Sequence, residues 1–279
     1  MRGARRRVVD RIMSALTFLA AVAVICPLLL IAGFLVYRGI SAVNLDFFLH
    51  LPKPVGEPGG GVANAIVGSV IMVGLAAAVG LPVGILAGVY LAESRDARLP
   101  WLLRFIADVL NGVPSIVFGI FAYTVVVLPM RRFSALAGGF ALGMIMVPIV
   151  IRTTEEMVRL VPGHLREAGL GLGLPRWKVT LRIVLPAARA GIVTGVIVAI
   201  ARISGETAPL LFTALGNRFW HQGLDQPIAA LPLQIYAYAI APYDDWHRQA
   251  WAGALVLITL VFTASLAARL ATRGRPLAR

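Results

Sequence analysis

The sequence predicts an all-α integral membrane protein with six transmembrane helices. Three observations support this fold class. Of 279 residues, 59% are hydrophobic and only 14% are charged, and the mean hydropathy is +0.84, unlike a soluble globular domain. About six windows approach the roughly 20 apolar residues that one helical span requires. The basic residues flank these windows and are divided unequally between the two sides.

The expected spans alternate across the bilayer, and the basic residues decide their direction. Eighteen Lys and Arg lie in segments on the side of the N-terminus and six lie on the other side. The positive-inside rule therefore predicts that both termini are cytoplasmic. The net charge of +13 is dispersed among loops, which disfavours nucleic-acid binding. We expect spans at residues 12–37, 64–91, 105–129, 135–157, 187–211 and 251–271.

The N-terminal part, residues 1–62, has a basic start and an apolar run like those of a signal peptide. The apolar run is too long and no small-residue cleavage site follows, so we expect a retained signal-anchor helix and an extracytoplasmic loop. The stretch LPKPVGEPGGGV marks an exposed boundary. The first span is thus predicted to lie outside a five-helix core formed by residues 63–271, with a cytoplasmic tail at 272–279.

Small residues predict how the core helices pack. Gly80, Gly84 and Gly88 fall on one helical face and favour close approach of a neighbouring helix. Gly191 and Gly195 repeat this spacing in the fifth span. The aromatic run LPLQIYAYAIA, which begins at residue 231, is expected to lie on the outer membrane surface.

The segment EAGLGLGLPRWKVTLRIVLP at 167–186 mixes apolar and basic residues, which predicts short surface helices rather than a span. Its spacing resembles the EAA motif of ABC-transporter permeases, with Gly169 in place of the second Ala. The resemblance implies a coupling helix within a loop at about 160–186 that docks on a separate ATPase subunit. The matching residues are Glu167, Ala168, Gly173, Ile183, Leu185 and Pro186.

Three further segments resemble, in order and spacing, the PstA family of phosphate ABC transporter permeases. They are GVPSIVFGIFAY at 112–123, VPIVIRTTEEMVRLVPGHLREAG at 147–169 and ARISGETAPLLFTA at 201–214. The resemblance covers the chain from about residue 8. It implies a type I ABC importer permease fold in the bacterial cytoplasmic membrane and import of inorganic phosphate. The implied partners are two copies of a PstB-like ATPase, a PstC-like permease and an extracytoplasmic PstS-like phosphate-binding protein.

The sequence lacks a G-x-x-x-x-G-K-[ST] motif, so we expect ATP and Mg to be used by the partner ATPase and no cofactor or metal to be bound by this chain. A permease for another oxyanion, such as sulfate, molybdate or phosphonate, is an alternative. A membrane-embedded enzyme is disfavoured because H-E-x-x-H and G-x-S-x-G are absent. A stand-alone channel is a third alternative, and ATP-independent flux through the purified chain would support it.

Charged residues within the predicted spans are the candidate substrate path. A charge in mid-membrane costs about 2.5–3.5 kcal/mol on insertion scales, so it must meet a partner or a wet cavity. Two arginines each precede a glutamate by four residues, which allows pairing on one helical face. The pairs could fix helix packing, or the arginines could bind an anion at two depths, Arg152 toward the cytoplasm and Arg202 near the middle. The path residues are Arg152, Glu156, Arg202 and Glu206, with hydroxyls from Thr153, Thr154, Ser204 and Thr207.

Overall fold

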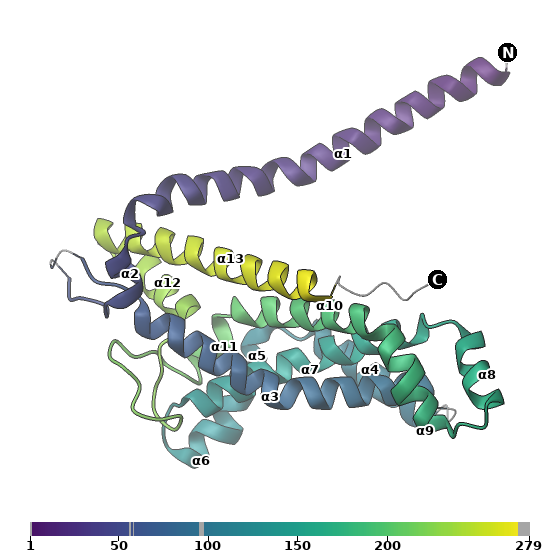
Figure 1. Cartoon of the computed structure of the whole chain (residues 1–279). Helices are drawn as coiled ribbons and strands as arrows, with labels where there is room; N and C mark the ends of the chain where they lie inside the picture. The colour runs from purple at the N-terminus through teal and green to yellow at the C-terminus, as the bar shows by residue number, and fades with distance from the viewer. Residues whose placement is uncertain (1, 56, 58, 95–97, 273–279) are drawn as a thin grey trace.

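A computed structural model describes residues 2–55, 57, 59–94 and 98–272, so nearly all of the tail expected at 272–279 lies outside the described residues. Figure 1 shows long helices laid side by side, with short helices at the two ends of the bundle. Within the described residues, five helices are long and apolar enough to cross a membrane, or up to six if one bent pair is a single span. The predicted all-α architecture is confirmed, and the predicted six spans correspond to these five helices and the bent pair.

The elements follow the predicted order. The long helices are α1 (Arg2–Gly39), α3 (Ala63–Glu93), α7 (Ala135–Arg159), α10 (Leu185–Ser204) and α13 (Asp244–Thr272). The bent pair consists of α4 (Arg98–Gly112) followed by α5 (Ser115–Ala122), η2 (Tyr123–Val127) and α6 (Leu128–Met130). The remaining short helices are η1 (Ile40–Ala42), α2 (Leu45–Leu49), α8 (Gly163–Gly171), α9 (Arg176–Val179), η3 (Thr180–Val184), α11 (Ala208–Leu211) and α12 (Leu231–Ala239).

The third predicted span is not one continuous helix. Its two parts, Arg98–Gly112 and Ser115–Met130, meet at an angle of 102°. The break falls at Val113–Pro114, because the proline disfavours helical geometry in the residue before it and begins the next helix as its N-cap. As a result, α4 is a separate helix, and its Arg104 and Asp108 contact the C-terminal parts of α3 and α7.

The fifth predicted span is shifted toward the N-terminus. A helical stretch runs from Arg176 to Ser204 without a break, whereas the sequence predicted 187–211. Its first part includes η3, a turn of π-helix in which the Leu185 N–H donates to the Thr180 carbonyl. Pro186 cannot donate to the helix, and a local widening just before it accommodates the missing hydrogen bond. The second half of the predicted surface segment is therefore the start of a long helix.

The glycine face of α3 packs directly on α7, as predicted. A Cβ on Gly84 would lie 2.7 Å from Cβ of Val150, and one on Gly88 would lie 2.6 Å from the Ile151 carbonyl oxygen. The two helices run in the same direction, since later glycines of α3 meet later residues of α7. Helix α7 is the core of the bundle, with 61% of its apolar window buried against 6% for α1.

Helix α10 packs on another side of α7 through its own pair of small residues. A Cβ on Gly191 would overlap Sδ of Met157, and one on Gly195 would lie 2.6 Å from Oγ1 of Thr153. The order of these contacts shows that α10 is antiparallel to α7. The predicted role of the second glycine pair in close packing is confirmed.

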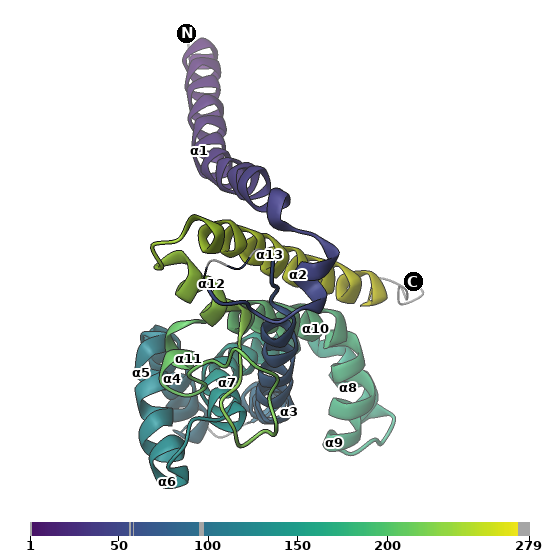
Figure 2. The same cartoon turned by 90° about the vertical axis from the view of Figure 1, so that its left-hand side faces the viewer.

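Helix α1 lies outside this core, as expected for the first span. Figures 1 and 2 show it diverging from the bundle toward its N-terminus. Its other end touches α13, where the rings of Phe34 and Trp251 meet edge to face at 5.3 Å. Gly39 permits this contact because a Cβ there would lie 2.8 Å from the Trp251 carbonyl oxygen.

The segment between α11 and α13 folds onto the bundle. The run that was expected on the membrane surface forms α12, and its Leu231, Leu233 and Tyr238 are buried. Hydrogen bonding explains the difference, because the Leu231 N–H donates to Oγ of Ser69 on α3 at 2.7 Å. The preceding loop also caps α7, accepting backbone hydrogen bonds from the first residues of that helix at carbonyls of Thr213, Leu224 and Gln226.

We predict that Gly88→Ala destabilises the protein by about 1–3 kcal/mol, because the added methyl would force α3 away from α7. The matched control is Gly74→Ala on the same helix, where a Cβ would have no heavy atom within 4 Å. The control should be neutral or slightly stabilising, since alanine favours helices. Unfolding in mixed micelles titrated with SDS measures both changes, and equal effects of the two substitutions would contradict the packing role.

Candidate functional site

A buried carboxylate organises the charged residues at the C-terminal end of α7. Glu155 is only 1% exposed. Its Oε1 is 2.5 Å from Nε of Arg104 and 2.9 Å from Nη2 of Arg159, and its Oε2 is 3.1 Å from Nη1 of Arg152. Both carboxylate oxygens are thus paired. A charge buried this deeply is tolerated only when opposite charges and hydrogen bonds compensate for the lost water.

Arg104 connects three helices through this carboxylate. Its Nη2 donates to the carbonyl oxygen of Leu91 near the end of α3 at 2.7 Å, while its Nε contacts Glu155 of α7. Since Arg104 belongs to α4, these bonds fix the bent helix against the ends of α3 and α7. The side chain of Arg104 therefore has a structural role.

Arg152 pairs with residues other than the one predicted. Its Nε lies 2.9 Å from Oδ1 of Asp108 on α4, and its Nη1 contacts Glu155. The predicted pair of Arg152 with Glu156 is wrong, because Glu156 is exposed and forms no ion pair with the described residues. Glu155, three residues after Arg152, faces the core, whereas Glu156, four residues after it, does not.

Glu155 was missed by the sequence reasoning, although a signal for it exists. It follows Arg152 by three residues and precedes Arg159 by four, so one helical face carries both arginines beside it. The partner Arg104 is distant in the sequence and no local pattern reveals it. Choosing between the two adjacent glutamates required the position of α4.

The second predicted pair is confirmed. Nη2 of Arg202 lies 3.6 Å from Oε1 of Glu206. The Glu206 side chain is 15% exposed, whereas that of Arg202 is 58% exposed. The helix α10 ends at Ser204, so Glu206 lies in the short link to α11 and reaches back toward the last turn. Among the described residues, Arg202 has one carboxylate partner, at 3.6 Å, whereas Arg152 has two, at 2.9 and 3.1 Å.

The hydroxyl groups near these arginines bond mainly to their own helices. Oγ1 of Thr153 donates to the carbonyl of Ile149 at 2.9 Å, and Oγ of Ser204 donates to that of Ile200 at 2.7 Å. Oγ1 of Thr154 is buried without a hydrogen-bond partner in the described residues. Thr207 is the half-buried residue before α11. Their predicted role as donors to an anion stays a prediction.

The two arginines lie at different heights along the bundle. Gly195 of α10 faces Thr153 of α7, and the helices are antiparallel. Arg202 is farther along α10, which places it about 10 Å beyond the level of Arg152 at 1.5 Å per residue. The packing of α10 on α7 therefore separates the two arginines along the bundle, and their depths in the membrane stay a prediction.

The EAA motif begins in a hairpin formed by α8 and α9 and ends at the start of α10. Glu167 and Ala168 are exposed on α8. Gly173 ends this helix with φ +81°, a conformation that L side chains rarely adopt. Its N–H donates to Leu170, and the next N–H, that of Leu174, donates back to the Gly169 carbonyl. This is a Schellman motif, in which glycine at the first position after the helix cap reverses the chain.

The C-terminal part of the motif packs back on α8. A Cβ on Gly169 would lie 2.6 Å from Cδ1 of Ile183, so the glycine at this position leaves space for the motif's own isoleucine. Ile183 lies in η3, while Leu185 and Pro186 begin α10. The hairpin is therefore continuous with a long helix of the core. Packing therefore explains why Gly169 stands in place of the second alanine of the motif.

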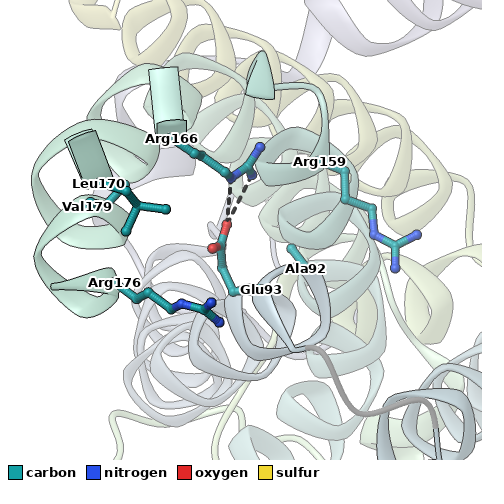
Figure 3. A pocket seen from close by; sticks show the side chains of 7 residues that line it. All are labelled: Ala92, Glu93, Arg159, Arg166, Leu170, Arg176 and Val179. Carbon is teal, nitrogen blue, oxygen red and sulfur yellow. Dashed lines mark hydrogen bonds and ion pairs between the residues drawn. The ribbon is translucent and has the colours of Figure 1, made fainter. Parts of the chain in front are cut away.

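Arg166 attaches the hairpin to the ends of two core helices (Figure 3). Its Nη2 and Nε contact Oε1 of Glu93 on α3 at 3.0 and 3.2 Å. Its remaining donors reach the carbonyls of Val158 and Val161 at the end of α7, at 2.8 and 2.7 Å. Sequence reasoning missed both Arg166 and Glu93, because they are separated by more than seventy residues.

Comparisons with known proteins agree with this architecture. The model of the family described as binding-protein-dependent transport system inner membrane component matches residues 80–274. A phosphate transport system permease protein PstA from Xylella fastidiosa is 46% identical over 95% of this chain and 93% of its own length. The PstA of Pasteurella multocida is 45% identical over 95% of both chains. PstA 1 of Mycobacterium tuberculosis is 37% identical over 98% of this chain and 92% of its own.

A solved structure shares the fold at low sequence identity. The inward-facing MetNI methionine ABC transporter has a chain that matches with a TM-score of 0.60 and 19% identity. The match covers 76% of this chain and 93% of that one. The arrangement of helices is thus that of an ABC importer permease.

We predict that Glu155→Gln lowers the free energy of unfolding by about 3–5 kcal/mol, because three arginines would lose their shared buried counter-charge. The neighbouring Glu156→Gln is the matched control, since Glu156 is exposed, and it should change stability by at most about 0.5 kcal/mol. Unfolding by SDS titration gives the stabilities, and limited proteolysis within 98–112 reports release of α4. A Glu155→Gln protein as stable as the control would contradict the organising role.

Proposed function

From the premise that this chain belongs to the family of binding-protein-dependent transport system inner membrane components, and within it to the PstA permeases, we propose how it takes part in phosphate import. The observation that carries the function is the identity of 46% with a phosphate transport system permease over 95% of the chain. The chain is a multi-pass membrane subunit of an ABC importer. We place it in the bacterial cytoplasmic membrane, with the end that carries α8 and α9 in the cytoplasm.

Arg202 is the residue proposed to meet phosphate in the membrane. Its side chain is 58% exposed although it lies in an apolar segment. A charge facing lipid would be costly, which supports a wet cavity on this face of the chain. A planar guanidinium offers paired donors to two phosphate oxygens. Glu206, at 3.6 Å, holds Arg202 in the resting state and yields it to the anion.

Arg152 serves as a second station nearer the cytoplasm. It is bound by Asp108 and Glu155, so an anion would have to compete with two carboxylates. The exposed Asp108 is the one that could move away. Glu156 contributes to the charge of the surface without holding Arg152. Stepwise passage from Arg202 to Arg152 is the path that we propose.

The exposed position of Arg202 supports a second permease as the other wall of the cavity. We infer a PstC-like subunit beside this chain and a PstS-like binding protein that delivers phosphate from outside. Energy comes from two copies of a PstB-like ATPase, since this sequence carries no nucleotide-binding G-x-x-x-x-G-K-[ST] motif. ATP and Mg would be bound there, and this chain is not itself an enzyme.

The hairpin of α8 and α9 is the proposed contact with the ATPase. Glu167 and Ala168 on its exposed surface would face that partner. Movement of the hairpin would reach α3 and α7 through Arg166, which bonds to Glu93 and to carbonyls of α7. It would also reach α10 directly, because α9, η3 and α10 form one helical stretch. These links allow ATP binding to change access to the path.

We predict that Arg202→Gln abolishes ATP-driven phosphate uptake while the complex still assembles. Reconstituted vesicles that contain this chain with its second permease, ATPase and binding protein provide the measurement with radiolabelled phosphate. Excess sulfate should not compete; full competition would instead support another oxyanion as the cargo.

The control for Arg202 is Arg189→Gln, which removes an exposed arginine from the same helix nearer its start. It should retain uptake close to the wild-type rate. Normal transport by the Arg202→Gln complex would contradict the proposed contact with phosphate. Failure of that variant to assemble would instead assign Arg202 to packing between subunits.

We predict that Gly173→Ala uncouples ATP hydrolysis from transport, because alanine at φ +81° costs about 1–2 kcal/mol and loosens the turn between α8 and α9. Stimulation of ATP hydrolysis by the loaded binding protein should fall, and uptake should fall with it. The control, Gly171→Ala, adds a Cβ with no heavy atom within 4 Å and an ordinary φ. Equal stimulation in both variants would show that the turn does not transmit the signal.

A further inference from the structure

A second basic site lies between the hairpin and the ends of the core helices (Figure 3). The recess has a volume of about 320 Å³. Its charged lining residues are Glu93 of α3, Arg159 of α7, Arg166 of α8 and Arg176 of α9. Leu170 and Val179 form an apolar wall. Three guanidinium groups thus share the lining with one carboxylate.

The three arginines differ in how many of their guanidinium N–H groups already form hydrogen bonds or ion pairs within the protein. Arg166 is committed to Glu93 and to two backbone carbonyls. Arg159 uses Nη2 on Glu155 and is 53% exposed, which leaves other N–H groups for a further partner. Arg176 forms no ion pair or hydrogen bond through its side chain with the described residues. Figure 3 shows Glu93 between the guanidinium groups of Arg166 and Arg176.

We propose that this recess binds a phosphate group between Arg176 and Arg159, at a site separate from the transport path. The positive charge exceeds what Glu93 neutralises, so the recess favours an anion. Guanidinium groups match phosphate oxygens with paired, charge-assisted hydrogen bonds. Arg176 has no carboxylate partner in the described residues, and Arg159 shares Glu155 with Arg104 and Arg152, so both can still bind a phosphate oxygen. Such a group would join α7 to α9 and restrain the hairpin.

The phosphate group can come from two sources at this position. Inorganic phosphate released into the cytoplasm would occupy the recess when its concentration rises, and this source rests on the proposed function. The headgroup of an anionic phospholipid would occupy it from the adjacent membrane surface, where basic pockets between helices bind such headgroups. The recognition chemistry is the same in both cases, and separate measurements distinguish them.

The experiment uses the complete complex in nanodiscs, without ATP or binding protein. All samples carry Arg202→Gln, which removes the first station of the proposed path. Any binding that remains at Arg152 is common to all samples, so a difference between the recess variants reports this site and does not depend on the proposed function. One arm measures radiolabelled inorganic phosphate bound in nanodiscs of phosphatidylcholine. The other measures retention of phosphatidylglycerol and cardiolipin by native mass spectrometry.

The test variant is Arg176→Gln, and Arg182→Gln is the matched control. Arg182 is an exposed arginine of the same segment that does not line the recess. We expect Arg176→Gln to weaken binding of phosphate or retention of anionic lipid about tenfold, which corresponds to about 1.4 kcal/mol. Arg182→Gln should leave both unchanged. Arg176→Lys should recover only part of the binding, because it restores charge without the planar pair of donors.

The two positive outcomes identify the source, as free phosphate or as a lipid headgroup. Unchanged binding of both ligands in Arg176→Gln would overturn the proposal. Equal losses in Arg176→Gln and Arg182→Gln would also overturn it, because they would indicate attraction by the overall charge. Loss of coupled ATP hydrolysis without any change in phosphate or lipid binding would assign Arg176 to the contact with the ATPase instead.

Discussion

The close contact of α3 with α7 is the constraint on which the rest of this structure depends. Glycines at four-residue spacing leave no α3 side chain at the contact, so α7 side chains pack directly on the α3 backbone and the two helices run together. Their ends then present the Leu91 carbonyl and Glu93 on one side and Glu155 on the other. Arg104 and Arg166 each bridge both helices as a result. A wider spacing would separate the bridged groups and leave buried charges without partners.

The arginines of the bundle form a series ordered by how firmly they are held. Arg104 and Arg166 are bound to carboxylates and backbone carbonyls and act as structural connections. Arg152 is held by two carboxylates, whereas Arg202 pairs only with Glu206 within the part of the chain that the structure describes. Arginine donors that the protein has already used are poor ligands for a passing anion. The exposed, weakly paired guanidinium is therefore the one suited to exchange partners during transport.

The same connections explain how a signal at one end of the molecule could reach the path. The hairpin of α8 and α9 is joined to α3 and α7 by Arg166 and to α10 by an unbroken helical stretch. Arg202 lies at the far end of that stretch, where α10 ends and the chain turns toward α11. A displacement of the hairpin would thus act on the transport residues along a rigid element and through the α7 contacts of α10. A phosphate group in the neighbouring recess would act on the same connection.

The sequence by itself determined the elements whose signals are local. Apolar windows predicted the spans, although not the break in the third or the early start of the fifth. Four-residue glycine spacing predicted the contact faces of α3 and α10, and the motif at 167–186 located the turn between α8 and α9. It also determined the pair of Arg202 with Glu206, since both lie within about one helical turn. Only the tertiary structure decided that Glu155 rather than Glu156 holds Arg152, and that α12 is buried against the bundle. It alone also placed Arg176 beside Glu93. These outcomes depend on which distant helix faces a residue, and neither composition nor periodicity along one segment encodes that neighbour.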